Sequence, residues 1–240
     1  MKNSQNIQTV NNSSHVTLGN QTIEAETSPA AENEETVRVL FLAANPAGTS
    51  SLHLDQEIKA IDEALRRSRL SARFRLEQSW AVGDRELQDG LLRWQPEIVH
   101  FSGHGAPSGR LLLESSMLRD LGNAAPPSPP STDPQVDALA RVFAAARGKI
   151  RCLVLNACHT ESTARAIAQS VGCVIGMSQS VADAAAIRFS WAFYNALGYG
   201  LSVKKAFELG TAQMGLADSQ QADVPRLVTS GVDPAQIVFG

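Results

Sequence analysis

Three things are scarce in this chain of 240 residues, and each scarcity excludes a class of protein. It has only 3 cysteines, too few for a disulfide framework. It has no basic opening followed by an apolar stretch and no apolar run near the roughly 18 residues that a membrane-spanning helix needs. Its formal net charge is −3, which argues against the broad basic surface that nucleic acids or anionic membranes attract. We therefore expect a protein of the reducing cytoplasm, with no nucleic-acid partner and no membrane partner.

Metal-binding side chains are also few. His100, Cys158 and His159 are the candidate ligands of a zinc site, and His104 is a further histidine nearby. Zinc takes three or four protein ligands at ordered spacing, and these residues do not follow such a spacing. We expect no metal and no cofactor.

From Val37 onward, short apolar runs alternate with helical patterns. Leu54, Ile58, Ile61 and Leu65, for example, recur at the spacing of a helix packed on a sheet. This repeated order predicts an α/β fold, a three-layer sandwich in which helices cover both faces of a mostly parallel central sheet. Strands are predicted at 37–44, 74–80, 97–101, 150–155 and 172–177, and helices at 54–68, 84–93, 136–146, 160–169 and 183–197, the second capped by Asp84. A short hairpin return is expected at 111–114, and the proline-rich stretch 115–134 is expected to be a mobile loop.

Two residues combine chemistry with this pattern. His104 and Cys158 each follow an apolar strand, and parallel strands present their carboxyl ends, where ligands bind, at one edge of the sheet. A free thiol has a pKa of about 8.5, so a neighbouring imidazole is needed to create the nucleophilic thiolate. Gly105 and Cys158 are positioned to offer backbone N–H groups to an oxyanion. The alternative, a small buried residue, fits Cys152 and Cys173 better because both lie inside apolar runs.

The motifs resemble a known family. The segments 39–46, 100–105 and 155–158, followed by 174–177 and 193–197, are similar in sequence and order to the bacterial CHAT family, which groups caspase-like peptidases with separase and gingipain relatives. The resemblance covers about 37–240. It implies a caspase-like fold, a catalytic dyad of His104 and Cys158, and an endopeptidase that is often an effector of prokaryotic immunity or programmed cell death. The residues just after Cys158 and the insertion at 115–134 depart from the family pattern.

Asp183 is a candidate for the substrate pocket. It lies between a predicted strand and a predicted helix, where an acidic residue in Arg-specific relatives lines the pocket for the P1 side chain. The alternative is that Asp183 caps a helix that begins at Ala184.

The first 23 residues form a separate module. They are rich in Asn, Gln, Ser and Thr, contain no proline, and cannot form a globular core, but such sequences stack into cross-β arrays. Residues 14–23 resemble the HET-s-type prion-forming motif and the short bacterial amyloid signalling sequences, with a turn at Gly19 and Asn20. The motif residues are Val16, Leu18, Gly19, Asn20 and Ile23. The alternative is a disordered leader over 1–36. Residues 24–36, with five glutamates, are predicted to be a solvated linker before a peptidase domain at 37–240.

Together these features predict a cysteine endopeptidase that acts on a protein substrate. An NLR-like sensor with a matching motif would template residues 1–23, and self-assembly would concentrate the attached domains. Two alternatives stay open: a non-catalytic interaction module of the same fold, and a cysteine hydrolase or acyltransferase of small molecules.

Overall fold

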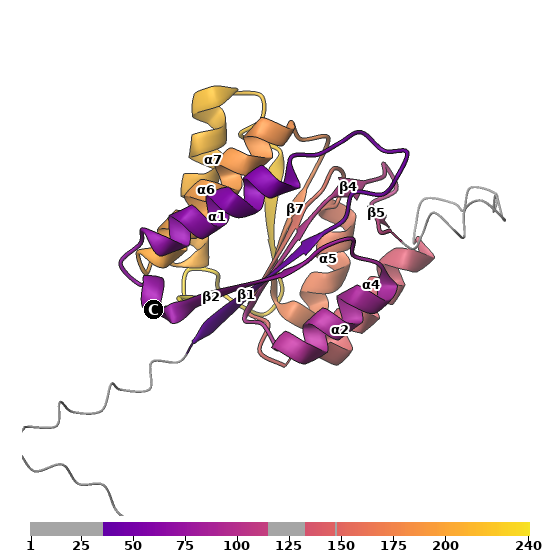
Figure 1. The fold of residues 1–240 in the computed structure, drawn as a ribbon, viewed down its shortest axis with the longest axis horizontal. Coiled ribbons are helices and arrows are strands. Elements are labelled where there is room, and N and C mark those ends of the chain that lie inside the picture. Colours follow the sequence, from indigo (N-terminus) through magenta and orange to yellow (C-terminus); the bar gives the residue numbers. More distant parts are fainter. Residues whose placement is uncertain (1–35, 115–132, 147) are drawn as a thin grey trace, which may run out of the picture. The chain divides into compact units, whose positions relative to one another are not determined.

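The computed structural model describes residues 36–114, 133–146 and 148–240. Its main sheet has six strands in the order β2-β1-β3-β6-β7-β8 (Figure 1). The first five run parallel, and β8 pairs antiparallel with β7 at one edge. The predicted α/β fold with a mostly parallel central sheet is confirmed. The strands are β1 (Val37–Ala43), β2 (Phe74–Ser79), β3 (Ile98–Ser102), β6 (Cys152–Asn156), β7 (Cys173–Met177) and β8 (Pro225–Thr229).

Helices cover both faces of this sheet, as Figure 1 shows. One layer contains α1 (Leu54–Arg66), α6 (Asp183–Gly198) and α7 (Val203–Ala217), and the other contains α2 (Asp84–Trp94), α4 (Pro134–Ala146) and α5 (Glu161–Val171). Each layer has its own hydrophobic core, and the sheet separates the two cores.

Strand β1 shows how the sequence produces the three layers. Val39 and Phe41 belong to the core beneath α1 and α6, whereas Leu40 and Leu42 belong to the core beneath α2. Successive side chains of a strand point to opposite faces, so a strand that is buried on both faces must be apolar throughout. This requirement explains the continuous apolar run that predicts the strand.

The predicted boundaries differ from the structure in detail. Helix α2 begins at Asp84 itself, and the residue at its N-cap is Gly83. Asp84 is therefore not the cap. The side chain of Glu86 accepts a hydrogen bond from the backbone N–H of Gly83 at 3.0 Å instead. Two elements after residue 197, α7 and β8, were not predicted, and α7 packs extensively on α6.

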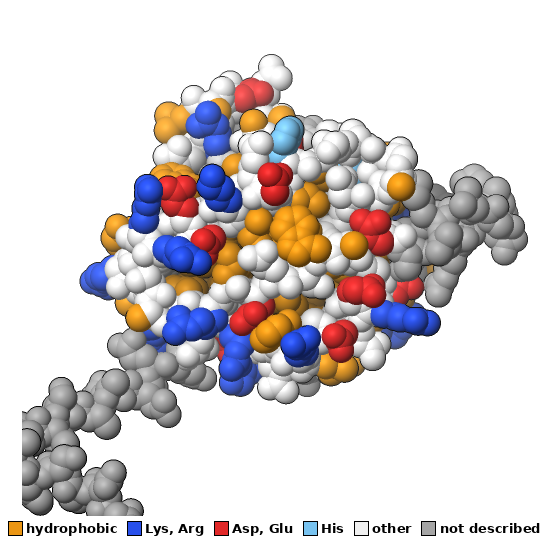
Figure 2. Space-filling view, in the orientation of Figure 1, with side chains coloured by type: hydrophobic (Ala, Val, Ile, Leu, Met, Phe, Trp, Pro, Cys, Tyr) orange, Lys and Arg blue, Asp and Glu red, His pale blue; other side chains and the backbone are white. Residues whose placement is uncertain are grey.

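The surface in Figure 2 shows basic side chains interspersed with acidic ones. Two arginines at the end of α1 are ion-paired within the helix, Arg66 to Asp62 and Arg67 to Glu63. No helix among the described residues is long and apolar enough to cross a membrane. The predicted amyloid motif, including Val16, Leu18, Gly19, Asn20 and Ile23, lies outside the described residues, as does most of the predicted loop at 115–134.

Candidate functional site

The sheet register places His104 and Cys158 at equivalent positions on neighbouring strands. Strands β3 and β6 are parallel partners, and their last register pair is Ser102 with Asn156. His104 and Cys158 each follow this pair by two residues. Both residues lie at the carboxyl edge of the sheet, and both are half-buried. The two strands therefore deliver an imidazole and a thiol to the same edge, where parallel α/β sheets bind ligands.

A small hairpin closes this edge over the cysteine. Strands β4 (His104–Gly105) and β5 (Leu111–Leu112) pair antiparallel. This pairing confirms the short hairpin return predicted at 111–114. Gly105 lies so close to the backbone of Cys158 that an added Cβ would overlap the Cys158 carbonyl oxygen and lie 3.2 Å from the Cys158 nitrogen. On the far side of the turn, the Thr163 hydroxyl donates a hydrogen bond to the Gly109 carbonyl at 2.6 Å. The His104 hairpin and the Cys158 segment thus pack as one unit.

The ring of His104 is held by a backbone carbonyl. Its Nε2 lies 2.8 Å from the carbonyl oxygen of Ser50, in the loop between β1 and α1. A carbonyl oxygen only accepts hydrogen bonds, so Nε2 carries the proton in the neutral ring and Nδ1 carries the free lone pair. The contact therefore fixes both the orientation and the tautomer of an imidazole that can act as a base at Nδ1. Nothing in the sequence pattern pointed to Ser50, because the contact uses its backbone.

The turn that carries Cys158 is fixed by its neighbours. The buried Thr160 hydroxyl donates to the carbonyls of Leu155 and Ala157 and accepts from the backbone N–H of Met177. His159 adopts a left-handed backbone conformation with φ of 59°. Its Nε2 lies 3.2 Å from the Ser180 hydroxyl, in the loop after β7. A non-glycine residue with positive φ costs free energy and persists only where its surroundings hold it, as these contacts do.

Cys158 has a different environment from Cys152 and Cys173. Cys152 and Cys173 are fully buried, as predicted, and Cys158 is half-buried. A hydrogen bond with Cys173, together with burial, raises the pKa of the Cys152 thiol well above its ordinary value, so that this thiol stays protonated. Among the described residues, nothing accepts a hydrogen bond from the backbone N–H of Cys158. The backbone N–H of Cys158 could therefore donate to an oxyanion that forms next to the thiol of the same residue.

Asp183 lies at the same edge of the sheet, but its carboxylate is occupied. It accepts a hydrogen bond from the backbone N–H of His53 at 3.0 Å and lies 2.5 Å from His53 Nδ1. The alternative reading of Asp183 as a helix cap is wrong, because α6 begins at Asp183 and the N-cap is Ala182. Asp183 instead ties the start of α6 to the start of α1, just beyond the loop that presents the Ser50 carbonyl.

The sequence reasoning missed two features near this edge. One is a cavity of about 320 Å³ at the ends of β1 and β2, lined by Leu52, Trp80 and the acidic Asp55 and Glu114 among others. The other is Glu57, a carboxylate only 2% exposed and buried under the sheet edge. A signal for Glu57 was present, because it falls on the apolar stripe of its helix next to Ile58.

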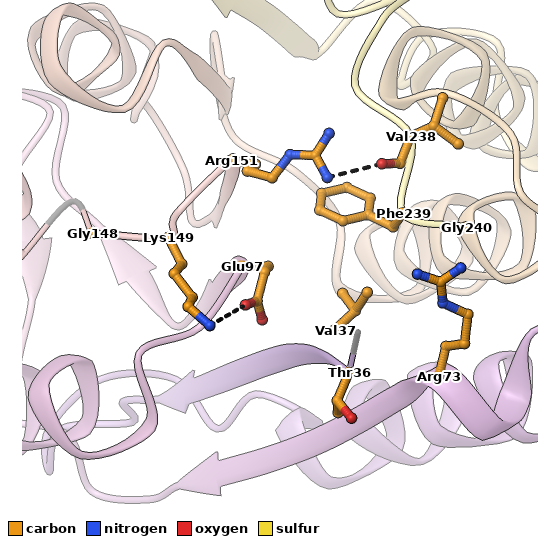
Figure 3. Close-up of a pocket in the computed structure, with 10 residues that line it drawn as sticks. All are labelled: Thr36, Val37, Arg73, Glu97, Gly148, Lys149, Arg151, Val238, Phe239 and Gly240. Carbon is orange, nitrogen blue, oxygen red and sulfur yellow. Dashed lines mark hydrogen bonds and ion pairs between the residues drawn. The ribbon is translucent and has the colours of Figure 1, made fainter. Parts of the chain in front are cut away.

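A second cavity, of about 400 Å³, lies at the opposite edge (Figure 3). Its walls come from the residues just before β3 and β6 and from the last residues of the chain. Lys149 lies 3.9 Å from Glu97, and Arg151 donates to the Val238 carbonyl and stacks over Phe239. These contacts engage Lys149 and Arg151, and the cavity is separated from His104 and Cys158 by the length of the strands. Over the described part of the chain, no three His, Cys, Asp or Glu side chains gather as a metal site requires.

Comparison with known proteins identifies a family that matches most of the chain. The model of the CHAT domain family matches residues 5–230, beginning within the range that the sequence assigned to a separate motif. A protein described as a Roc-COR-CHAT protease, from an unknown prokaryotic organism, is 27% identical over 169 residues. That alignment covers 68% of this chain and only 15% of the relative.

A solved structure shares the fold. The crystal structure of gingipain R, an Arg-specific cysteine proteinase, superposes with a TM-score of 0.55 over 86% of this chain and 48% of that one. The sequence identity is 11%, so this likeness shows a common fold and nothing more.

Proposed function

The chain belongs to the CHAT domain family, and from that premise we propose that it is a cysteine endopeptidase whose dyad is His104 and Cys158. The observation that carries the proposal is the approach of the Gly105 hairpin to the Cys158 backbone, combined with the Ser50 carbonyl on His104 Nε2. The first places the two segments together. The second gives the imidazole the tautomer that a general base needs.

The proposed reaction uses these atoms in order. His104 Nδ1 takes the proton of the Cys158 thiol, and the thiolate attacks the carbonyl carbon of a peptide bond. The backbone N–H groups of Gly105 and Cys158 stabilise the negative charge that develops on the carbonyl oxygen. The imidazolium returns its proton to the leaving amine as the C–N bond breaks. Water then hydrolyses the acyl-enzyme thioester and regenerates the thiol.

We propose that Asp183 determines the preference for the P1 side chain. The alternative is Asp55, which lines the cavity beside the β1–α1 loop. To reach Asp183, a basic P1 side chain must displace His53, whose Nδ1 lies 2.5 Å from the carboxylate. Asp55 has no such requirement, because it lines an existing cavity. Arg selectivity lost in Asp183→Asn but kept in Asp55→Asn assigns the pocket to Asp183, and the reverse result assigns it to Asp55.

We further propose that residues 1–23 regulate this activity by amyloid-like templating in a bacterial immune or cell-death pathway. The support is the sequence of the segment and its position before the peptidase domain. The name of the Roc-COR-CHAT protease joins a CHAT protease to Roc-COR in one protein, which is consistent with control of a CHAT domain by another module. In this chain the controlling protein would be an NLR-like sensor that shares the motif, and assembly would raise the local concentration of peptidase domains.

The test uses the full purified chain and fibres of a synthetic peptide of residues 1–23 as the template. We expect fibre-dependent cleavage of a peptide library by the wild type and by Cys173→Ala, a control that alters a buried thiol. We expect none by Cys158→Ala or His104→Ala. Cleavage that survives Cys158→Ala would exclude the dyad. Two results would exclude templating through this segment. One is cleavage by the wild type that is equally fast without fibres, and the other is fibre-dependent cleavage by a chain that lacks residues 1–23.

A further inference from the structure

Six polar side chains are buried together beneath the strand ends that carry His104 and Cys158. They come from four elements, and each is at most 4% exposed. They are Glu57 of α1, His100 and Ser102 of β3, Asn156 of β6, and Ser190 and Tyr194 of α6. None of them takes part in the proposed reaction.

Glu57 is the centre of this cluster. Its Oε1 accepts hydrogen bonds from Asn156 Nδ2 at 2.5 Å and from Ser190 Oγ at 2.6 Å, and it lies 2.9 Å from His100 Nε2. Its Oε2 accepts from the Ser102 hydroxyl. Tyr194 completes the cluster, with its hydroxyl 3.2 Å from His100 Nδ1.

The carboxylate is kept ionised in spite of its burial. Burial alone raises the pKa of Glu57, but the charge of His100 and the hydrogen bonds from His100, Ser102 and Ser190 outweigh it and leave the pKa below its ordinary value. A buried carboxylate of this kind commonly contributes little net stability, because the loss of its hydration offsets the attraction of its partners. An apolar side chain at position 57 would fill the same helix stripe, so stability alone does not account for Glu57.

The position of the cluster supplies the missing reason. Ser102 and Asn156 are the last register pair of β3 and β6, and each lies two residues before a member of the proposed dyad. One carboxylate therefore binds both strands at the last point before they diverge into the His104 hairpin and the Cys158 turn. The backbone N–H of Gly103 also donates to the Asn156 carbonyl at 3.3 Å, which links the same two segments.

We infer that Glu57 is a positioning residue that sets the separation of His104 and Cys158 by holding the ends of β3 and β6 on one carboxylate. The inference rests on the proposed function. Glutamine at position 57 presents an NH₂ group in place of one oxygen, so either Ser102 or the Asn156 and Ser190 pair loses its acceptor. The strand ends then lose a common anchor, and a misplacement of about 1 Å between catalytic groups is enough to lower a rate by roughly 100-fold.

The test measures the reactivity of Cys158 directly, so that no substrate is required. Full-length protein is treated with iodoacetamide at pH 6.5, and the alkylation of Cys158 is followed by peptide mass spectrometry. Cys152 and Cys173 serve as buried internal references. We expect the wild type to react at least about tenfold faster than Glu57→Gln and His104→Ala, because both variants lose an imidazole placed to take the thiol proton.

The matched control is Glu97→Gln. Glu97 is also a buried carboxylate, 7% exposed, but it lies just before β3 at the opposite edge of the sheet, where it accepts from the Arg38 backbone N–H. We expect its alkylation rate to stay within twofold of the wild type. Equal rates in wild type and Glu57→Gln, with His104→Ala slow, would overturn the positioning role and leave the proposed function intact. Equal rates in wild type and His104→Ala would overturn both.

A second variant, with a smaller change to the cluster, tests the inference if Glu57→Gln fails to fold. Ser102→Ala removes one donor to Glu57 and leaves the contact between Glu57 and His100 in place. We expect about a threefold slower alkylation in a protein that still folds, and in the peptide assay a lower kcat at unchanged KM, because dyad geometry and not substrate binding is altered. A folded Ser102→Ala protein with wild-type reactivity would contradict the inference.

Discussion

The substitution Gly105→Ala probes the contact on which the site depends. The backbone of Gly105, on the His104 hairpin, packs directly against the backbone of Cys158. An alanine Cβ there would overlap the Cys158 carbonyl oxygen and lie 3.0 Å from the carbonyl carbon, well inside ordinary van der Waals contact. Backbone atoms cannot rotate away as a flexible side chain does.

The size of the effect follows from the geometry. To reach normal contact, the hairpin and the Cys158 turn must separate by about 1 Å or more, because protein interiors leave no room to absorb the added methyl. A displacement of that size between a base and its nucleophile corresponds to a loss of roughly 100-fold in kcat/KM. The backbone N–H of residue 105 is retained, so the loss comes from displacement and not from a missing oxyanion donor.

The assay is kcat/KM on a cleaved peptide, with circular dichroism to establish folding. Gly90→Ala, on helix α2, is the control, since its Cβ would meet the ends of two flexible side chains and no backbone atom among its nearest neighbours: Leu40 at 3.3 Å and Leu42 at 3.7 Å. We expect it to keep wild-type activity and to gain up to about 1 kcal/mol from helix propensity. A folded Gly105→Ala protein with kcat/KM within twofold of wild type would refute the reasoning.

Three further predictions concern stability and specificity. Thr160→Ala leaves the buried Met177 N–H without its acceptor and should lower the free energy of unfolding in urea by about 1–3 kcal/mol, whereas Thr160→Ser should retain most of it; equal losses would contradict this account. Folding lowers the pKa of Glu57, so the ionised Glu57 side chain stabilises the fold at pH values above its unfolded-state pKa of about 4.3. This stabilisation is lost as the pH falls through the pKa of the folded state, by up to about 1.4 kcal/mol per pH unit. Glu57→Gln should therefore flatten the acid limb of the unfolding free energy, and an unchanged limb would show that Glu57 is not the group responsible. Asp183→Asn should lower kcat/KM for substrates with Arg at P1 more than for other substrates; an equal loss for all substrates would instead show that Asp183 acts only by tying the start of α6 to the start of α1.

The sequence was sufficient for the order of the main strands and helices up to residue 197 and for the sheet edge at which His104 and Cys158 lie. Continuous apolar runs such as that of β1 arise because both faces of the strand are buried, so they predict a central parallel strand directly. The carboxyl ends of such strands then locate His104 and Cys158.

What could not be predicted depends on contacts between distant segments. The Ser50 carbonyl has no side-chain signature, and the role of Glu57 appears only when α1, β3, β6 and α6 come together. Asp84 was wrongly read as a helix cap because Gly83, with the Glu86 side chain bonded to its N–H, occupies that position. Helix α7 and strand β8 were missed after residue 197.

The most direct test of the central claim is N-terminal peptide profiling of cells that express the full chain with its candidate sensor activated, compared with Cys158→Ala. The account predicts new protein N-termini that appear only when Cys158 is present, with a shared P1 residue. Identical profiles, with assembly of the chain demonstrated in both, would contradict an endopeptidase and favour an interaction module or a hydrolase of small molecules.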